Sequence, residues 1–418
     1  MHNNSTNDLF LSVLVLGGGG REHAIASSIS QSPLLKKLYT DSVNPGILSL
    51  NAEHLPKEQW LSTALDLVIV GPEKPLVDGW SDRFRESGIA VFGPSSTAAQ
   101  LEGSKAFAKS VMDKCGIPTA KHVVIESIEQ AKIAIQDHFP LQCVVKADGL
   151  AGGKGVFICT TAQETLNAVE ELLLGRFGAA GKQIVIEEKL NGPEISLIGI
   201  SDGTAIKALL PARDHKRRFD KDLGPNTGGM GAFCPVSDVS PDDIESLTAQ
   251  VLKPIIECMS AMGSPFVGAL YAGLMLTDDG PKVLEYNARF GDPETQAILP
   301  LLNGDWLEQF YFAATGQLEL SPPLDWKDQS SCCVVLCAKS YPYGSSKGKP
   351  ISISLQNLEH VFLSGASTND NGQLVTNGGR VLSVVCLGPD LEQARAQSYT
   401  AVEKIAFEDK DYRHDIAK

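Results

Sequence analysis

A repeating succession of short apolar runs and helical stretches constrains the first hundred residues more than any other feature. The run "FLSVLVLG" (10–17) predicts a strand, "REHAIASSIS" (21–30) a helix, and "LDLVIVGPE" (65–73) and "GIAVFGP" (88–94) two further strands. Strands that alternate with helices in this way indicate a parallel, doubly wound sheet. Because ligands bind such sheets at the carboxyl ends of the strands, we expect function in the loops that follow them.

The pattern of predicted elements changes near residue 105, where helices and hairpins replace the alternation of single strands and helices. The stretch "FAKSVMDKCG" predicts a helix closed by Gly116, and "AQETLNAVEELL" predicts another. Two hairpins are expected, turning at Asp202-Gly203 and at Asp279-Gly280. After the Pro-rich "SPPLDW" the chain is again rich in predicted strands. We therefore divide it into three regions, 1–104, 105–320 and 321–418.

Composition excludes several classes of protein. The net charge of −14 has the wrong sign for binding the backbone of a nucleic acid. No apolar run reaches the roughly 18 residues that span a bilayer, so we expect no membrane association. The nine cysteines include no C-x-x-C pair, which argues against a disulfide scaffold or a structural zinc site and favours a reducing cytosol.

The glycine-rich "LGGGGREH" (16–23) lies between a predicted strand and a predicted helix. Glycines there let backbone N–H groups approach an anion at the positive end of the helix. The dinucleotide fingerprint requires a third glycine where Glu22 stands, which argues against an NAD-dependent oxidoreductase. We favour phosphate binding over a tight structural turn.

A second glycine-rich stretch, "KADGLAGGKGV" (146–156), follows a strand that ends in Lys146 and contains Lys154. It is not a P-loop, because Gly155 replaces the required Ser or Thr. A strand lysine beside a flexible flap suits nucleotide phosphates, and a solvated hairpin turn is the alternative. The later "IVIEEKL" (184–190) could offer backbone groups to an adenine, although exposed glutamate pairs are usually only solvated.

The densest basic cluster, "ARDHKRRFDKD" (212–222), precedes the glycine-rich "GPNTGGMGA" (224–232). One interpretation is a clamp that concentrates an anionic substrate beneath a mobile lid. The other is a solvated loop, which is the commoner fate of a run of charges.

Polar residues follow an apolar strand abruptly in "YNARFGDPETQ" (286–296). Side chains two apart share a face of a strand, so Glu285 and Asn287 point the same way, opposite Tyr286. A carboxylate and an amide oxygen together can hold Mg²⁺, and Arg289 offers a planar fork to a carboxylate or phosphate. The alternative is a solvent-facing strand end, which would not explain the whole cluster.

Taken together these segments resemble the phosphoribosylamine–glycine ligases, ATP-grasp enzymes of purine biosynthesis. The residues that carry the resemblance lie along nearly the whole chain and are "GGGGREHA" (17–24), "IVGPEKPLV" (69–77), "FGPSSTAAQLEGSKAFAK" (92–109), "VVKADGLAGGKGV" (144–156), "DHKR" (214–217), "GPNTGGMGA" (224–232), "YAGLM" (271–275), "RFGDPETQ" (289–296) and "TNGGRVL" (376–382). The fold that the resemblance implies is α/β and α+β, with a Rossmann-like N-terminal domain, an ATP-grasp domain and a small β-rich C-terminal domain.

The resemblance also implies an activity, ATP-dependent joining of glycine to 5-phosphoribosylamine through glycyl phosphate, with Mg²⁺ or Mn²⁺ as cofactor. The implied residues are Lys105, Lys146 and Lys154 at the ATP phosphates; Glu187, with the backbone of Glu188 and Leu190, at the adenine; Glu194 at the ribose; Glu285 and Asn287 at the metal; Arg289, Asp214, Lys216 and Asp292 as the catalytic, glycine-binding group; and Gly18, Gly19, Gly20 and Glu73 at the phosphoribosylamine. We expect a cytoplasmic monomer.

The sequence departs from the family pattern at several places. Asn44-Pro45-Gly46-Ile47 stands where Pro-Gly-Asn is usual, Lys189 replaces an aromatic residue, and "FLSGA" (362–366) replaces a Phe-His-Ala-Gly type of stretch. None of these removes a proposed catalytic group. Another ATP-grasp ligase or carboxylase, and a nucleotide-binding regulatory protein without catalysis, stay open as alternatives.

Overall fold

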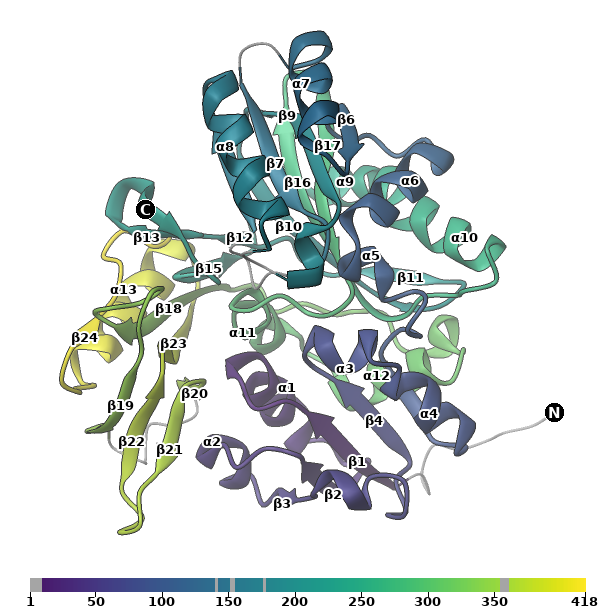
Figure 1. Cartoon of the computed structure of the whole chain (residues 1–418). Coiled ribbons are helices and arrows are strands. Elements are labelled where there is room, and N and C mark those ends of the chain that lie inside the picture. The colour runs from purple at the N-terminus through teal and green to yellow at the C-terminus, as the bar shows by residue number, and fades with distance from the viewer. Residues whose placement is uncertain (1–9, 140–141, 151–154, 176–177, 354–360) are drawn as a thin grey trace.

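The structure is a computed structural model that describes the chain apart from residues 1–9, 140–141, 151–154, 176–177 and 354–360. Figure 1 shows three lobes: an N-terminal lobe at the bottom, a central region that rises above it, and a C-terminal lobe at the left. No described helix is long and apolar enough to cross a membrane.

The N-terminal lobe is built on a parallel sheet with the strand order β3-β2-β1-β4-β5. Its strands are β1 (Leu11–Leu16), β2 (Leu35–Thr40), β3 (Glu53–His54), β4 (Leu67–Val70) and β5 (Ala90–Phe92). Its helices are α1 (Gly20–Ser30), α2 (Pro45–Leu48), α3 (Glu73–Val77), α4 (Trp80–Glu86) and α5 (Gln100–Gly103). The predicted parallel, doubly wound arrangement is confirmed.

Strand β1 shows why the strands of this lobe are continuous apolar runs in the sequence. Val13 and Val15 pack into one hydrophobic core, whereas Leu14 and Leu16 pack into another. Both faces of the sheet are therefore buried, as is usual for a parallel sheet.

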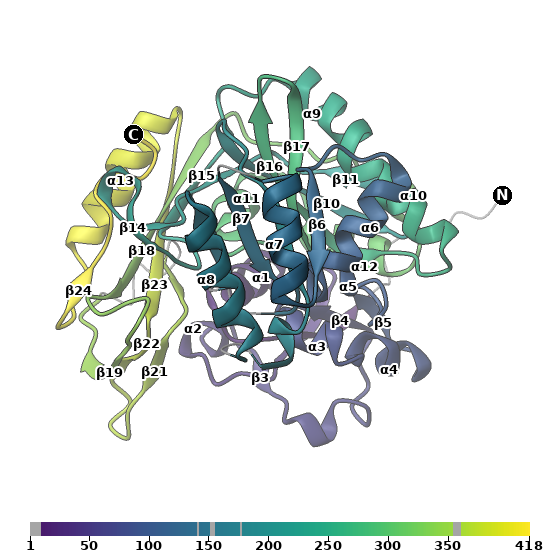
Figure 2. The same cartoon turned by 45° about the horizontal axis from the view of Figure 1, so that its top comes forward.

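The central region contains two antiparallel sheets. The first has the order β6-β9-β7-β8 and consists of β6 (His122–Ile125), β7 (Cys143–Ala147), β8 (Val156–Cys159) and β9 (Ile184–Glu188). Helices α7 (Ile128–Asp137) and α8 (Ala162–Leu173) cover one of its faces (Figure 2). The second sheet has the order β11-β10-β16-β17 and consists of β10 (Glu194–Asp202), β11 (Ile206–Ala208), β16 (Val267–Thr277) and β17 (Gly280–Asn287).

Helix α6 (Lys105–Cys115) connects this region to the N-terminal lobe, and α10 (Lys253–Ala261), which comes after α9 (Pro241–Leu247) in the chain, packs beside α6. Gly116 closes α6 with a φ of 66°, as the sequence predicted. The second hairpin differs by one residue from its prediction. Thr277 pairs with Gly280, so Asp278 and Asp279 form the turn.

The C-terminal lobe contains a sheet with the order β12-β15-β18-β23-β20 and a smaller one with the order β19-β22-β21. Their strands are β12 (Arg213–Asp214), β15 (Gly231–Cys234), β18 (Ser330–Ala338), β19 (Ser346–Pro350), β20 (Val361–Leu363), β21 (Ala366–Thr368), β22 (Leu374–Gly378) and β23 (Arg380–Gly388), with β24 (Lys410–Asp411) beside β18. Helix α13 (Leu391–Glu403) packs on β18 and β23, while α11 (Glu294–Ile298) and α12 (Trp306–Ala314) lie toward the N-terminal lobe. Strands β12 and β15 come from residues well before position 321, so the C-terminal sheet is shared between two of the regions divided by sequence.

Cysteine pairing differs in part from the sequence prediction. Cys115 at the end of α6 and Cys258 in α10 form a disulfide, although their positions in the chain are 143 apart. The other seven cysteines are free and buried. No local spacing marks a pair so far apart in sequence, because only the packing of α6 against α10 brings it together.

Candidate active site

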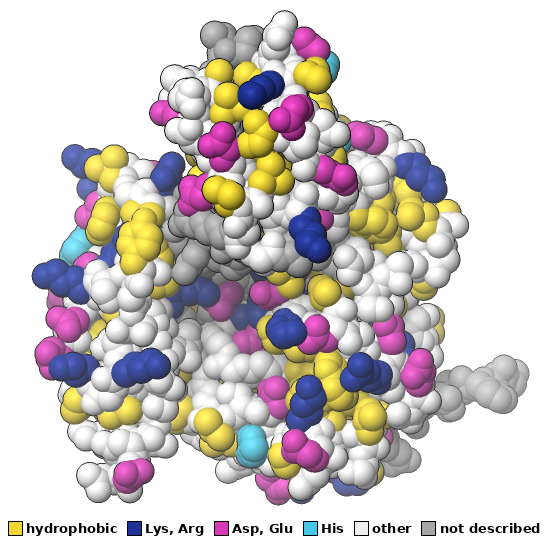
Figure 3. Space-filling model, in the orientation of Figure 1, with side chains coloured by type: hydrophobic (Ala, Val, Ile, Leu, Met, Phe, Trp, Pro, Cys, Tyr) yellow, Lys and Arg dark blue, Asp and Glu magenta, His cyan; other side chains and the backbone are white. Residues whose placement is uncertain are grey.

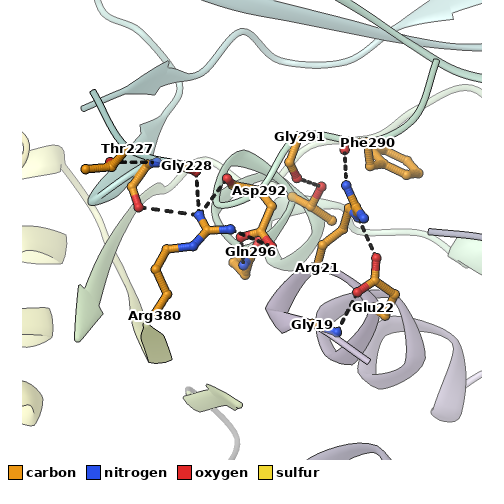
Figure 4. Close-up of polar contacts among 12 residues, drawn as sticks. Gly19, Arg21, Glu22, Thr227, Gly228, Phe290, Gly291, Asp292, Gln296 and Arg380 are labelled. Carbon is orange, nitrogen blue, oxygen red and sulfur yellow. Dashed lines mark hydrogen bonds and ion pairs between the residues drawn. The ribbon is translucent and has the colours of Figure 1, made fainter. Parts of the chain in front are cut away.

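Stretches that are far apart in the sequence converge on the turn of residues 289–296 (Figure 4). Arg21 of α1 donates to the carbonyl of Phe290 (3.1 Å), and Arg380 of β23 donates to the carbonyl of Asp292 (2.9 Å). Figure 3 shows that the surface is hollowed where the lobes meet, with acidic and basic side chains inside the hollow. The turn is thus held from the N-terminal and the C-terminal lobes at once.

Strand β17 ends with Glu285 and Asn287 on one face, opposite Tyr286. Val283 and Tyr286 are three residues apart, yet both are buried in the same hydrophobic core. The register of β17 against β16 shifts just after Val283, so Leu284 is an extra residue in the strand. This bulge keeps both apolar side chains in the core and turns Glu285 and Asn287 away from it.

The Glu285 carboxylate lies in a positive environment. Burial alone would raise its pKa, but Lys216, Lys105 and Lys146 lower it. Among the described residues, no hydrogen bond or ion pair occupies the side chain of Glu285 or Asn287. An ionised carboxylate and a free amide oxygen are hard donors that fit Mg²⁺ or Mn²⁺. In the described part of the chain no group of three or more His, Cys, Asp or Glu could hold a metal, so a metal at these two donors would need further ligands from a substrate or water.

A buried cluster of charges lies beside this strand end. The Glu187 carboxylate contacts Lys146 Nζ through one oxygen and Lys109 Nζ through the other (2.7 Å). Lys146 also donates to the carbonyl of Leu284 (3.1 Å), which connects the two central sheets. Burial would raise the pKa of Glu187, and the two ammonium groups lower it. The Glu187 side chain, expected at an adenine, is therefore the counter-ion of two lysines.

Sequence reasoning missed Lys109. It lies one helical turn after Lys105 on α6, so the two lysines share a face of that helix. That four-residue spacing was the available signal. Lys109 also donates to Thr119 Oγ1 (2.7 Å), and its side chain is buried.

Strand alternation places Lys146 and Glu187 on the face of the first central sheet that turns away from α7 and α8. Val145 and Ile186, their neighbours, pack against those helices. On the same open face Ile158 of β8 is 46% exposed. An apolar surface beside two lysines suits a flat ring that carries phosphates.

The other residues that were predicted to bind the nucleotide, Glu188, Leu190 and Glu194, lie between the end of β9 and the start of β10. The Glu188 carboxylate accepts from the N–H of Lys121 (3.0 Å) and pairs with Lys282 (3.2 Å). Leu190 is half-buried after β9. Glu194, at the start of β10, pairs with Lys216 (3.1 Å), so a residue expected at the ribose meets one expected in catalysis.

Lys105 opens helix α6 next to the end of strand β7. Asp148, just beyond β7, accepts from Ser104 Oγ (2.9 Å) and from the N–H of Ala106 (2.7 Å). These bonds attach the first turn of α6 to the strand that carries Lys146. Lys154 lies outside the described residues.

Arg289 is held by two carboxylates. Its NH2 group lies 2.8 Å from Glu102 Oε1, and its Nε lies 3.6 Å from Glu73 Oε2. Burial would lower the pKa of Arg289, but Glu102 and Glu73 raise it. Burial raises the pKa of Glu102, which Arg289 opposes. The structure thus brings together Arg289 and Glu73, which were predicted for glycine and for phosphoribosylamine respectively.

Asp292 is tied into its turn by two side chains, one on each carboxylate oxygen. It accepts from Gln296 Nε2 (2.9 Å) and pairs with Arg380 NH2 (3.2 Å). Arg380 also donates to the carbonyl of Gly228, which belongs to the segment predicted as a lid (Figure 4). Arg380 was missed as a site residue, although it lies inside the family-like "TNGGRVL" (376–382).

An acidic spot lies on the other side of the turn. Glu294 accepts from Ser196 Oγ (2.8 Å), which also bonds Tyr271 (2.8 Å). Burial and the nearby Glu294 raise the pKa of Asp214. Asp214 Oδ1 is buried and has no hydrogen-bond partner among the described residues. Two carboxyl groups at one place attract a cation such as an ammonium group.

The basic segment differs from the predicted clamp and lid. Arg213 pairs with Asp238 (3.0 Å), and Arg218 pairs with Asp411 (2.6 Å). Strands β13 (Arg217–Phe219) and β14 (Leu223–Asn226) form a hairpin, and β15 is part of the C-terminal sheet. The described segment is therefore attached to the C-terminal lobe, because the strand pairing of β15 and the ion pair of Arg218 with Asp411 oppose its opening.

The glycine-rich loop is arranged around Glu22. Its carboxylate accepts from the N–H of Gly19 (2.6 Å) and from Arg21 Nε (2.6 Å). A Cβ at Gly71 would lie 2.2 Å from this carboxylate, and Gly17 has a φ of 103°. The glycines thus make room for Glu22, which explains why the dinucleotide fingerprint fails here.

Strand β20 of the C-terminal lobe docks against this loop. Asn44 Nδ2 donates to the carbonyls of Gly18 and Leu363, both at 2.8 Å. His23 Nδ1 accepts from the N–H of Leu363 (2.8 Å), and the His23 ring meets Phe362 edge-on. Two stretches that depart from the family pattern, at Asn44 and at "FLSGA" (362–366), are therefore in direct contact.

His23 gives the fold a specific dependence on pH. Burial lowers its pKa to about 4, from an ordinary value of 6.5. The folded state binds the proton less tightly, so the stabilisation is complete above pH 6.5 and is lost as the pH falls toward 4. We expect this loss to be on the order of 3 kcal/mol. Urea unfolding between pH 4 and 7.5 should show it, and His23→Asn, which keeps an acceptor but cannot titrate, should have a shallower profile.

Family models match the chain in three consecutive parts: the N domain of phosphoribosylglycinamide synthetase over residues 11–102, its ATP-grasp (A) domain over 103–295 and its C domain over 331–418. The chain belongs to the phosphoribosylglycinamide synthetase family. The fold predicted from the resemblance, with Rossmann-like, ATP-grasp and β-rich C-terminal parts, is confirmed.

Relatives of this synthetase family cover the full length. The phosphoribosylamine–glycine ligase of Caldanaerobacter subterraneus is 42% identical over 97% of this chain and 99% of its own. The crystal structure of phosphoribosylamine–glycine ligase from Thermotoga maritima has a TM-score of 0.88 at 35% identity, covering 97% of this chain and all of that one. The biotin carboxylase domain of the Hydrogenobacter thermophilus 2-oxoglutarate carboxylase, at 17% identity and a TM-score of 0.72 over 97% of this chain and 92% of its own, shares the fold.

Proposed function

We propose that this synthetase-family chain joins glycine to 5-phosphoribosylamine while ATP is converted to ADP and phosphate, the second step of purine biosynthesis. The observation that carries the proposal is that all three parts of the family lie in order on a chain whose lysines, Glu285, Asn287 and Arg289 meet around one turn. We also propose that it works as a monomer in the cytoplasm.

The reaction needs an activated carboxyl group, because the carboxylate of glycine is a poor electrophile. Transfer of the γ-phosphoryl group gives glycyl phosphate, which the amine then attacks with release of phosphate. Phosphoryl transfer requires positioning and charge neutralisation rather than a nucleophilic side chain. Lysines, an arginine and a metal are therefore sufficient.

We assign ATP to the open face of the first central sheet. Lys146 and Lys105 would neutralise the phosphates, and the apolar face that includes Ile158 would carry the adenine. Glu285 and Asn287 would hold Mg²⁺ or Mn²⁺, whose other ligands come from phosphates and water. When bound, the metal supplies further positive charge to the phosphates.

Glycine has a site with complementary charges. The acidic spot of Asp214 and Glu294 suits its ammonium group, and the Arg289 guanidinium suits its carboxylate. Asp292 would brace the turn through Arg380 instead of touching glycine. Phosphoribosylamine would bind by its phosphate at the Gly18–Gly20 loop, close to Glu73.

A three-component assay tests the function. We expect ADP release only when glycine, a divalent cation and phosphoribosylamine generated in the reaction mixture are all present with ATP. Equal ADP release without glycine, or with bicarbonate in its place, would contradict the assignment and favour another ATP-grasp ligase or a carboxylase. No ADP release under any of these conditions would favour a nucleotide-binding protein without catalysis.

A further inference from the structure

The peptide between Gly18 and Gly19 is held at both ends. Its carbonyl accepts from Asn44 Nδ2 (2.8 Å), and its N–H donates to Glu22 Oε2 (2.6 Å). Carbonyl and N–H point in opposite directions across a trans peptide, so the two bonds fix the plane of this peptide. The centre of the loop therefore has one orientation as long as both partners stay in place.

The fixed peptide determines where the neighbouring donors point. The N–H groups of Gly18 and Gly20 have no acceptor among the described residues, whereas that of Gly17 bonds Asp41 (2.7 Å). Free N–H groups at the start of a helix are the donors that bind a phosphate. Rotation of the Gly18–Gly19 peptide would change ψ of Gly18 and φ of Gly19, the two torsions that set how the flanking peptides with these N–H groups lie relative to each other.

Asn44 is anchored independently of the loop. Its Oδ1 accepts from the N–H of Gly46 (2.8 Å), and its second amide hydrogen reaches the carbonyl of Leu363 (2.8 Å). The side chain is 3% exposed, so water does not compete for these bonds. His23 accepts from the N–H of Leu363 itself, so side chains of the N-terminal lobe cover both backbone polar groups of this residue in an edge strand.

We propose that Asn44 is a positioning residue for the phosphorylated amine substrate. It holds the Gly18–Gly19 peptide in the orientation that presents free N–H groups to the phosphate, and strand β20 of the C-terminal lobe holds Asn44. The inference rests on the proposed assignment of the Gly18–Gly20 loop to that substrate. Asn44 does not touch the substrate and acts through the loop.

The test substitutes the amide group without changing its shape. In Asn44→Asp a carboxylate oxygen faces two carbonyl oxygens, and the peptide loses its fixed orientation. We expect the KM for phosphoribosylamine and the Ki of ribose 5-phosphate, a stable probe with the same phosphate, to rise about tenfold or more. The KM values for ATP and glycine should stay within about twofold, because their proposed residues do not contact Asn44.

Two further variants separate positioning from general destabilisation. Asn44→Ala removes the bonds without adding repulsion, and it should raise the same Ki if Asp is too disruptive to fold. Gln309→Glu is the matched control. This buried amide donates to the carbonyl of Pro322 (2.8 Å) and accepts from Ser321 Oγ (2.9 Å), away from the loop. Its substitution should lower the melting temperature and leave the Ki unchanged.

The variant Gly19→Ala distinguishes two ways in which the proposal could fail. Either the glycine loop does not bind the phosphate, or the loop binds it and Asn44 does not position the loop. A Cβ at Gly19 would lie 2.8 Å from Glu22 Oε2, so this small change disturbs the loop directly. If Gly19→Ala raises the Ki for ribose 5-phosphate but folded Asn44 variants do not, the positioning role is wrong. If neither changes it, the loop does not bind the phosphate and both statements are overturned.

Discussion

Glu285→Gln is expected to lower turnover by at least about 100-fold while the protein stays folded. The carboxylate forms no bond with the described residues and lies among lysines that lower its pKa, so its charge is free to act on a ligand. An amide keeps the shape and one oxygen donor but loses the charge that a divalent cation requires. Steady-state kinetics at several Mg²⁺ and Mn²⁺ concentrations, together with thermal unfolding, measure both effects.

A matched change at Glu308 provides the control. This half-buried glutamate lies in α12, away from the site, and Glu308→Gln should leave turnover unchanged. If the melting temperature of Glu285→Gln collapses while the activity of the remaining folded protein is normal, Glu285 is structural and the metal assignment fails.

Arg289→Met is expected to abolish activity and to lower the free energy of unfolding by about 3 kcal/mol. The substitution leaves Glu102 buried without the guanidinium that lies 2.8 Å from it. Its carboxyl would then be protonated in the folded protein at still higher pH. Stability should therefore fall as the pH rises above the pKa of the unfolded state, since the folded state binds the extra proton.

The double variant Arg289→Met with Glu102→Gln separates the two consequences. A neutral amide can still accept from the N–H of Ala288, as Glu102 Oε2 does at 2.8 Å, so most of the lost stability should return. Activity should not return, because the glycine carboxylate still lacks its partner. Denaturant unfolding and the ligase assay check this, and recovery of activity would show that Arg289 serves the fold alone.

The sequence predicted most of the fold because local patterns carry it. The parallel N-terminal sheet follows from apolar runs that alternate with helices, and helix α8 has the predicted bounds, 162–173. Strand β15 could not be placed in this way. Its partner, β18, is about a hundred residues later, and no local pattern encodes that pairing.

The site shows the same division between local and long-range information. The shared face of Glu285 and Asn287 follows from their spacing, but the bulge at Leu284 that makes it compatible with a buried Val283 depends on the register with β16. Arg380 reaches the turn from a different lobe, and only the tertiary fold gives it that role. Glu187 was expected at an adenine, with a solvated surface pair as the alternative, and its side chain is buried between two lysines in the structure.

The C-terminal sheet contains strands from both the central and the C-terminal regions of the chain, so the two regions cannot be separated without breaking the sheet. Cutting the chain between α12 and β18 would divide that sheet, because β15 pairs with β18 along Gly231–Cys234 and Ser331–Val334. Each fragment would then expose a strand edge that is covered in the whole protein. A protease that nicks residues 321–329 should therefore leave two pieces that stay associated under native conditions, and either piece expressed alone should aggregate.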